Sequence, residues 1–502
     1  MNRRHFSSAV LASAAAAATG CTSAQLTRRP DPLLFDPSRY TPQTVEVNGQ
    51  TLNVRAFENL PVVARPVEPE YQALNLYVPE AYFTGGRIGR FDARTAPIFL
   101  PNAVGGYMPA RPGTLTKSMS GPAEQTHRVS ASAVALSQGY VVAAPGARGR
   151  TLQAPDGRWT GKAPAAIVDL KAAVRWLRHN ADRLPGNVER IISNGTSAGG
   201  ALSALLGASG NHPDYEADLR ALGAAPGRDD IHAVSAYCPI TNLAHADEAY
   251  EWQFDGLREY RNVSISMLDF RVQRQEVVAQ LNDAQLALSA EMRANFAAYV
   301  NSLKLQAVDG TPLMLQADGR GSLRDHVAAL LLASARRALA AGQDVAATPW
   351  LQMQGGQVIA VDFSAYARAV GRMKGQPAFD GFALETGENQ LFGDSTTDKR
   401  HFTAWSSRHS QVPGATVADA ATVKAIDAMQ QLMDPRSTVA PHWRIRHGAV
   451  DRDTSLAVPA LLAAAARRRG GSVDLALPWA RPHSGDYDLD ELFAWTMSSA
   501  GA

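Results

Sequence analysis

A G-x-S-x-G pattern runs from Gly195 to Gly199 and places Ser197 at its centre. The apolar pair Ile191-Ile192 precedes it as the end of a buried strand, and an Ala/Leu-rich helical segment follows from Ala201. A sharp strand–turn–helix connection strains the serine backbone and holds the hydroxyl clear of the sheet. The N–H groups and dipole of the following helix favour a negative charge developing there. The pattern therefore predicts a nucleophilic serine.

A serine hydroxyl is a weak nucleophile near neutral pH, so it needs a base to take its proton and a third group to orient that base. Two loops that follow late strands offer these groups. Asp451 and Asp453 follow the strand that ends at Arg446, and His483 follows the strand that ends at Leu477. The chain order is then serine, acid, histidine, which is the order expected after such a turn.

Both roles have rivals in the sequence. We expect Asp451 to be the acid, because the first loop position lies nearest the end of the sheet, and Asp453 is the alternative. The two aspartates also fit a solvated turn, or the cap of a helix that begins near Thr454. His447 is the rival base, but it ends its own strand with a carboxylate only four residues on. We therefore predict His483 as the base.

A tetrahedral intermediate needs backbone N–H donors for its oxyanion. We expect one donor from Ala198, which follows the serine. The other is expected from Gly105 or Gly106, which come shortly after a buried strand over 96–100. Paired glycines at such a place allow the backbone to face a cavity.

Strands alternate with helices in the first half of the chain. Apolar runs of the fully buried kind occupy 96–100, 139–145 and 233–238, and an apolar stripe predicts a helix over 165–180. Asn48-Gly49 lies between two alternating stretches and predicts a hairpin. This pattern indicates an α/β protein with a mostly parallel central sheet and helices on both faces.

The alternation stops between residues 242 and 413. Helical stretches dominate there, over 277–305 and 323–341, and turns at Asp309-Gly310 and Gly355-Gly356 predict two hairpins. We expect a large inserted, mainly helical lid domain in this region.

The N-terminus has the features of an export signal. Arg3-Arg4-His5-Phe6 resembles a twin-arginine motif, and the apolar run over 9–18 is too short to cross a bilayer. Ala18 to Cys21 resembles a lipobox with alanine in place of leucine, so Cys21 is the expected lipidation site of a periplasmic or cell-surface lipoprotein. Cleavage near the alanines, giving a soluble secreted enzyme, is the alternative. The predicted divisions are a signal peptide (1–21), a tether (22–43), a first core part (44–241), a lid (242–413) and a second core part (414–502).

The composition narrows the class of partner. A net charge of +2 over 502 residues gives no reason to expect a nucleic-acid or membrane-surface partner. Cys238 has no second cysteine in a mature chain, so no structural disulfide is expected. We find no metal-ligand spacing and no dinucleotide fingerprint, and we expect no cofactor and no obligate protein partner.

Several segments together resemble the bacterial tannases of the Lactobacillus type. The likeness extends over most of the chain after the tether, and its motifs are Pro101 to Tyr107, Asn194 to Ser203, Gly210 to Tyr215 and Pro482 to Asp488. The resemblance implies an α/β-hydrolase fold and a serine esterase that hydrolyses galloyl esters through an acyl-enzyme.

The resemblance also implies roles for individual residues. Ser197, Asp451 and His483 match the catalytic triad of that family. Lys374, Glu388 and Asp453 match residues that contact the galloyl ring. Three adjacent phenolic hydroxyls donate well to carboxylates, and an ammonium group favours a partly ionised phenol. Without the resemblance, Lys374 and Glu388 would be interpreted as surface residues.

One departure separates this chain from the fungal tannases and related feruloyl esterases, which place cysteines beside the serine and the histidine. The corresponding neighbours here are Thr196, Ala198, Pro482 and Ser484.

The alternatives to a galloyl esterase are an esterase for other aryl or hydroxycinnamoyl esters, a non-catalytic polyphenol-binding lipoprotein, and a serine peptidase.

Overall fold

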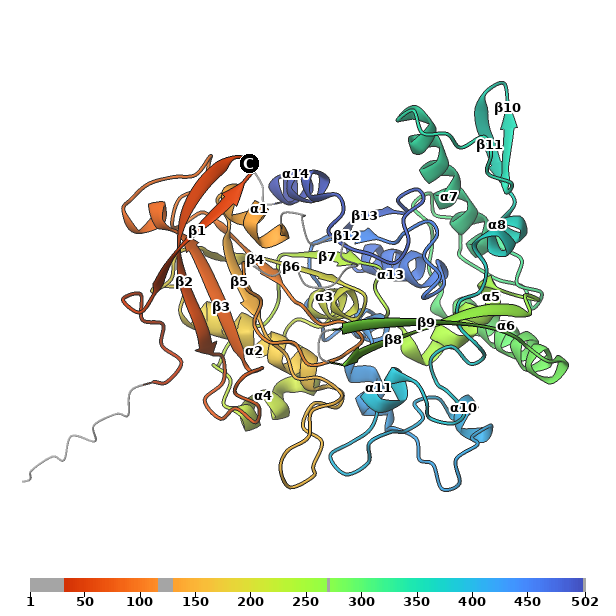
Figure 1. The fold of residues 1–502 in the computed structure, drawn as a ribbon, viewed down its shortest axis with the longest axis horizontal. Coiled ribbons are helices and arrows are strands. Elements are labelled where there is room, and N and C mark those ends of the chain that lie inside the picture. The colour runs from red at the N-terminus through yellow and green to blue at the C-terminus, as the bar shows by residue number, and fades with distance from the viewer. Residues whose placement is uncertain (1–30, 116–129, 269–270, 500–502) are drawn as a thin grey trace, which may run out of the picture. The chain divides into compact units, whose positions relative to one another are not determined.

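A nine-stranded sheet forms the centre of the computed structural model (Figure 1), which describes residues 31–115, 130–268 and 271–499. Every element named below lies in the compact unit from Leu33 to Ala502. The strands in spatial order are β1 (Thr41–Val47), β2 (Gln50–Pro61), β3 (Ala73–Pro79), β5 (Val141–Pro145), β4 (Pro97–Pro101), β6 (Asn187–Thr196), β7 (Ala233–Tyr237), β12 (His442–Arg446) and β13 (Ser472–Ala476).

The pairing of these strands confirms the predicted mostly parallel sheet. From β5 through β4, β6, β7 and β12 to β13 every neighbouring pair is parallel, whereas β1, β2 and β3 pair antiparallel. All residues of β5 and β7 are buried, as expected for strands covered on both faces. The carboxyl ends of β6, β7, β12 and β13 therefore meet at one edge, where the loops with Ser197, Asp451 and His483 begin.

Helices cover both faces of the sheet (Figure 1). α1 (Ala131–Ser137) and α14 (Leu489–Ser499) contact each other on one face, and α14 packs its Phe493 ring on Phe99 of β4. The opposite face carries α2 (Ala165–His179), α3 (Ala198–Ala208) and α13 (Ala457–Arg468), with α4 (Glu216–Leu222) beside α2. In α2 the residues from Ala165 to Leu177 are all buried, so this helix lies deep in the core.

A long insertion separates β7 from β12. Its hairpin of β10 (Leu351–Gln354) and β11 (Gln357–Val361) turns at Gly355-Gly356 as predicted, and a helix fills 322–340. The elements are α5 (Ala246–Gln253), β8 (Glu259–Leu268), β9 (Arg271–Gln280), α6 (Asp283–Leu303), α7 (Ser322–Ala340), β10 (Leu351–Gln354), β11 (Gln357–Val361), α8 (Phe363–Val370), α9 (Gly387–Leu391), α10 (Ala404–Arg408), α11 (Ala420–Ala425) and α12 (Ala428–Met433). Among the described residues no helix is both long and apolar enough to span a bilayer.

Two boundaries differ from the sequence prediction. Residues 277–280 belong to β9 rather than to a helix, and α6 begins only after Asn282, which caps it together with Gln285. Val277 and Val278 are β-branched and favour a strand. The tether expected over 22–43 is wrong from Leu33 on, because Leu33 and Phe35 are buried and β1 begins at Thr41.

Candidate active site

Ser197 sits on a strained turn between β6 and α3. Its φ of 61° and ψ of −123° are rarely adopted by residues with a side chain. Its N–H donates to the Tyr237 carbonyl at 3.0 Å, which fixes the turn on the end of β7. A Cβ on Gly195 would lie 2.4 Å from the Gly199 carbonyl oxygen, and one on Gly200 would lie 2.3 Å from that of Tyr237. The glycines are thus required by close packing.

The loop after β4 lies against this turn and is held there by Asn102. The side-chain nitrogen of Asn102 donates to the Gly199 carbonyl at 3.0 Å and to Ser203 Oγ at 3.0 Å. Gly106 follows in a left-handed conformation, with φ of 56°. Ala198 is the first residue of α3, so its N–H has no acceptor within the helix. The two segments expected to supply the oxyanion donors are therefore joined through one buried amide.

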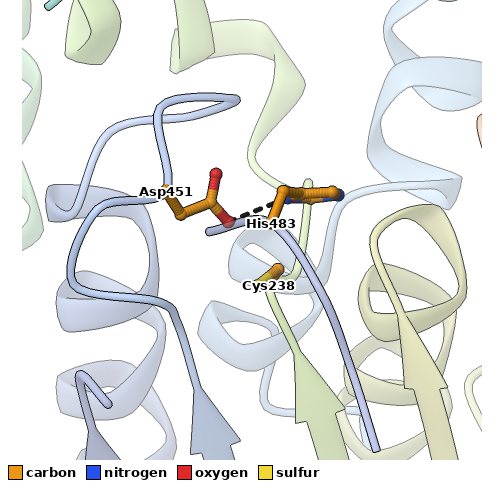
Figure 2. Close-up of side chains that lie close together, drawn as sticks. All are labelled: Cys238, Asp451 and His483. Atoms are coloured by element: carbon orange, nitrogen blue, oxygen red, sulfur yellow. Dashed lines mark hydrogen bonds and ion pairs between the residues drawn. The ribbon is translucent and has the colours of Figure 1, made fainter. Parts of the chain in front are cut away.

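His483 and Asp451 form a close pair from two separate loops (Figure 2). His483 Nδ1 lies 2.8 Å from Asp451 Oδ2. The Asp451 side chain is fully buried, whereas a quarter of the His483 side chain is exposed. The backbone N–H of Asp453 also donates to Asp451, at 2.9 Å. The carboxylate therefore holds Nδ1, which leaves Nε2 as the ring nitrogen free to face a substrate.

Charge, rather than burial, sets the protonation of this pair. Burial alone would raise the pKa of Asp451, but the charge of His483 and the hydrogen bonds from His483 and from the Asp453 N–H hold it well below its ordinary value. Burial would likewise lower the pKa of His483, but the carboxylates of Asp451 and Asp453 raise it well above its ordinary value. The site thus stabilises an imidazolium at His483.

His447, the rival base, has a different environment. Its side chain is completely buried, and its Nε2 lies 3.5 Å from Asp451 Oδ2. Burial lowers the pKa of His447, which keeps it neutral. A neutral, buried imidazole beneath the acid fits a packing role better than proton transfer to a substrate.

The loop that carries His483 is fixed over the ends of β6 and β7. A Cβ on Gly485 would lie 1.8 Å from Thr196 Oγ1, so this loop touches the serine turn directly. Asp486 accepts a hydrogen bond from Asn194 at 3.0 Å, and the Cys238 thiol donates to the Ser484 carbonyl at 3.3 Å. His483 is thus held beside the serine turn.

Lys374 and Asp453 extend the site into the insertion. Lys374 Nζ lies 3.8 Å from Asp453 Oδ1 and 3.9 Å from the centre of the Phe379 ring. Asp453 Oδ2 in turn lies 3.5 Å from His483 Nδ1. About a fifth of the Lys374 side chain and a quarter of the Asp453 side chain are exposed. The ammonium group of Lys374, the carboxylate of Asp453 and the imidazole of His483 therefore lie in a row. Each of these side chains is partly exposed and can be reached by a ligand.

Glu388 lies beside the loop of the paired glycines. It belongs to α9, and its charge acts on Arg150, whose Nε donates to the Gly106 carbonyl at 2.9 Å. Burial lowers the pKa of the Arg150 guanidinium, while Glu388 and Asp398 oppose that effect. Of the substrate residues implied by the resemblance, Lys374 and Asp453 are in contact with each other, whereas Glu388 approaches from the oxyanion side.

Tyr250 connects two of these segments and was not predicted from the sequence. Its hydroxyl accepts the backbone N–H groups of Met373 and Lys374, each at 3.0 Å, and donates to the Arg452 carbonyl at 3.1 Å. One buried hydroxyl thereby ties the lysine segment to the loop between the two aspartates. Nothing in the sequence around Tyr250 signals this role.

Known proteins share this fold over nearly the whole chain. A tannase from Lactobacillus plantarum is 46% identical, with a TM-score of 0.89, over 93% of this chain and all of the other. A Fusobacterium nucleatum tannase is 43% identical, with a TM-score of 0.88, over 93% and 99%. A tannin acyl hydrolase solved in complex with ethyl gallate matches at 46% identity and a TM-score of 0.86, over 93% and 98%.

Shorter matches point to the same chemistry. The BD-FAE family model matches residues 119–287. Esterase LipC of Mycobacterium tuberculosis is 46% identical over 66 residues, and Esterase LipQ of the same organism is 30% identical over 97 residues. These stretches cover 15% and 22% of the two esterases, less than a quarter of either.

Proposed function

The chain belongs to the bacterial tannase family of carboxylic ester hydrolases, and from this we propose that it cleaves galloyl esters of tannins and simple gallates to gallic acid. One observation of the structure carries the proposal: Asp453 lies within 3.5 Å of the ring nitrogen of His483 and within 3.8 Å of Lys374 Nζ. A recognition group for phenols is thus adjacent to the base.

In the proposed reaction His483 Nε2 takes the proton of Ser197 while the serine oxygen attacks the ester carbonyl. Asp451 stabilises the imidazolium that forms, and the N–H groups of Ala198 and of Gly105 or Gly106 receive the oxyanion. The imidazolium then protonates the leaving alcohol, and a galloyl-serine ester remains. Water, deprotonated by the same nitrogen, releases gallate.

The hydroxyls of the galloyl ring are the proposed specificity determinants. Asp453 accepts a hydrogen bond from one hydroxyl of the galloyl ring. Lys374 stabilises the negative charge that this hydroxyl gains when the contact partly ionises it. Glu388 accepts a hydrogen bond from another ring hydroxyl, on the side of the Gly105-Gly106 loop. Because these charged groups are partly desolvated, a ring without hydroxyls leaves them without partners, which costs about 1–3 kcal/mol for each lost partner.

The test compares methyl gallate with methyl ferulate and methyl benzoate. We expect kcat/KM to fall by roughly 5- to 150-fold for each ring hydroxyl contact that is lost. Lys374→Met is expected to slow methyl gallate turnover but to leave methyl benzoate turnover nearly unchanged, with Lys304→Met, at an exposed position, as the control. Equal rates on all three esters would instead favour a general aryl or hydroxycinnamoyl esterase.

Ser197→Ala tests the nucleophile. Turnover of methyl gallate is expected to fall by about 10⁴- to 10⁶-fold, and a fluorophosphonate probe should label the parent chain but not the variant. Full activity in the variant would refute the mechanism. Labelling of the parent without ester turnover would instead support a serine peptidase, whereas a parent that is neither labelled nor active would support a non-catalytic binding protein.

We also propose that the protein is exported and that Cys21 is lipidated after cleavage. The twin arginines, the short apolar run and the lipobox-like Ala18 to Cys21 support this, and all lie outside the described residues. Mass spectrometry of the mature N-terminus tests the proposal. A diacylglyceryl adduct on an N-terminal cysteine is expected, and an unmodified terminus near the alanines would contradict it.

A further inference from the structure

Cys238 occupies a special position that the mechanism above does not use. It follows β7 directly, is fully buried, and has a φ of 44° in the left-handed region, which is rare for a residue with a side chain. Its N–H donates to the Arg446 carbonyl at 2.7 Å and its thiol to the Ser484 carbonyl at 3.3 Å. These contacts fix the sulfur between the loops that carry the acid and the base.

Three different donor atoms meet at this point. The Cys238 sulfur, a carboxylate oxygen of Asp451 and a ring nitrogen of His483 all lie within 4.8 Å of one another. Figure 2 shows the three side chains arriving from separate segments, with the cysteine at the end of its strand below the Asp451–His483 pair. The nitrogen that faces the carboxylate is Nδ1, at 2.8 Å from Asp451 Oδ2.

This donor set has a clear metal preference. Thiolate, imidazole and carboxylate bind Zn²⁺ at roughly 2.0–2.3 Å, and thiolate favours soft ions over Mg²⁺ and Ca²⁺. Donors within 4.8 Å of one another need only small shifts to close around such an ion. A quarter of the His483 side chain is exposed, so solvent reaches one of the three donor groups.

We propose that Cys238, Asp451 and His483 form an inhibitory binding site for thiophilic divalent ions of the Zn²⁺ and Cd²⁺ type. Binding releases the thiol proton to solvent, and sulfur and Nδ1 each donate a lone pair to the ion. An imidazolium at His483 also releases its Nδ1 proton to solvent, whereas in a neutral ring that proton moves to Nε2. In both cases the ring keeps one proton, on Nε2, and Asp451 exchanges its hydrogen bond for the ion.

The consequence for catalysis follows from the tautomer. A proton on Nε2 leaves His483 without the lone pair that would accept the proton of Ser197, so turnover stops. A triad without the cysteine offers the same ion nitrogen and oxygen donors but no sulfur. The effect on turnover rests on the proposed function, whereas the binding itself does not.

The experiment uses the full chain with Cys21→Ser, so that Cys238 is the only thiol. Cd²⁺ is titrated while the sulfur-to-metal charge-transfer absorption and the hydrolysis of methyl gallate are followed together, with Mg²⁺ as the control ion. We expect one ion per chain to produce the band and the loss of turnover in parallel, and EDTA to reverse both. Mg²⁺ should produce neither.

Cys238→Ala separates the sulfur from the rest of the site. The band should disappear, and the Cd²⁺ concentration that halves the variant's own rate should rise by at least about tenfold. Ser484→Ala is the matched control, because it changes the same loop but no donor, and it should remain as sensitive as the parent. If Cys238→Ala does not fold, Cys238→Ser keeps a polar group there and should likewise give no band.

Two results would overturn the proposal. One is equal inhibition of the parent and Cys238→Ala, and the other is a charge-transfer band that appears without loss of turnover. A parent chain that shows the cysteine-dependent band but no hydrolysis of methyl gallate would support the metal site and would refute the galloyl esterase instead.

Discussion

At the scale of single residues, the base is placed between two carboxylates. His483 Nδ1 lies 2.8 Å from Asp451 and 3.5 Å from Asp453, and their charges raise the pKa of His483 despite its burial. A raised pKa makes the imidazole a better proton acceptor, but it also keeps the ring protonated, and therefore inactive, as the pH falls. The acidic limit of activity is therefore a property of both aspartates.

Asp453→Asn should separate the two contributions. Removing one of the two charges lowers the pKa of His483, so the acidic limb of the kcat/KM profile should move to lower pH. The profile is best measured on methyl benzoate, because this ester has no ring hydroxyls for Asp453 to bind. Asp490→Asn, at an exposed position, serves as the control. An unchanged limb, or one displaced to higher pH, would contradict this account.

Tyr250→Phe should affect binding more than chemistry. The variant removes a hydroxyl that holds two N–H groups and one carbonyl, so we expect a loss of about 1–3 kcal/mol in kcat/KM on methyl gallate and a smaller loss on methyl benzoate. Tyr215→Phe also removes a buried hydrogen bond to a carbonyl, that of Ala425, but belongs to the core. The prediction fails if both variants lose the same activity on both esters.

The sequence supplied some of these residues and not others, for a physical reason. Ser197 is marked by a local pattern, and Asp451 and His483 by their place after late strands. Lys374 and Glu388 came only from the family resemblance. Asn102 and Tyr250 were missed, because their contacts join segments about 100 residues or more apart, and neither has a local signal.

At the scale of elements, buried apolar runs and a turn dipeptide between alternating stretches were reliable guides, whereas a largely polar stretch without such a dipeptide gave no signal. Strands β4, β5 and β7 lie where fully buried runs predicted them, and Asn48-Gly49 makes the turn between β1 and β2. The long hairpin of β8 and β9 was missed. Its stretch has many polar residues and lacks a turn dipeptide such as Asn-Gly, and neither strand is part of the central sheet.

A buried ion pair joins two elements of the insertion and offers a test of their packing. Arg372 and Glu251 of α5 are both fully buried and hydrogen-bonded to each other, one of these bonds measuring 2.8 Å. Arg372→Met leaves the buried carboxylate without its cation, although the Ser289 hydroxyl still donates to it at 2.6 Å, so the free energy of unfolding should fall by about 3–5 kcal/mol. Adding Glu251→Gln should recover part of this loss in urea unfolding. A double variant less stable than Arg372→Met would refute the coupling.

At the scale of the whole molecule, the insertion and the sheet share one hydrophobic core. The main cluster of buried side chains contains Ile192 and Val234 of the sheet together with Phe296 and Val300 of α6. The division of the chain into core and lid over 242–413 stays a prediction. Because the core is shared, we expect groups buried in the insertion to affect the unfolding of the whole unit that begins at Leu33.

Asp247 provides a pH-dependent test at this scale. It is buried in α5 and accepts the N–H groups of Phe379 and Asp380 at 2.7 and 2.9 Å. Burial, together with the charge of Asp380, raises the pKa of Asp247 to about 7, although these hydrogen bonds oppose the rise. A carboxyl whose pKa is raised on folding binds its proton more tightly in the folded state. Its contribution to stability is therefore complete below the unfolded value and is lost as the pH rises to about 7.

Asp247→Asn removes this titration while keeping one acceptor. Between about pH 4 and 7 the parent should lose up to about 1.4 kcal/mol per pH unit through this group, and the variant should lack that slope. The variant should also be less stable at pH 5, because its amide NH₂ faces one of the two N–H groups. Thermal and urea unfolding across this range measure both effects, with Asp490→Asn as the exposed control. Parallel stability curves for parent and variant would show that Asp247 is already ionised throughout, and the assignment of its proton to the folded state would be wrong.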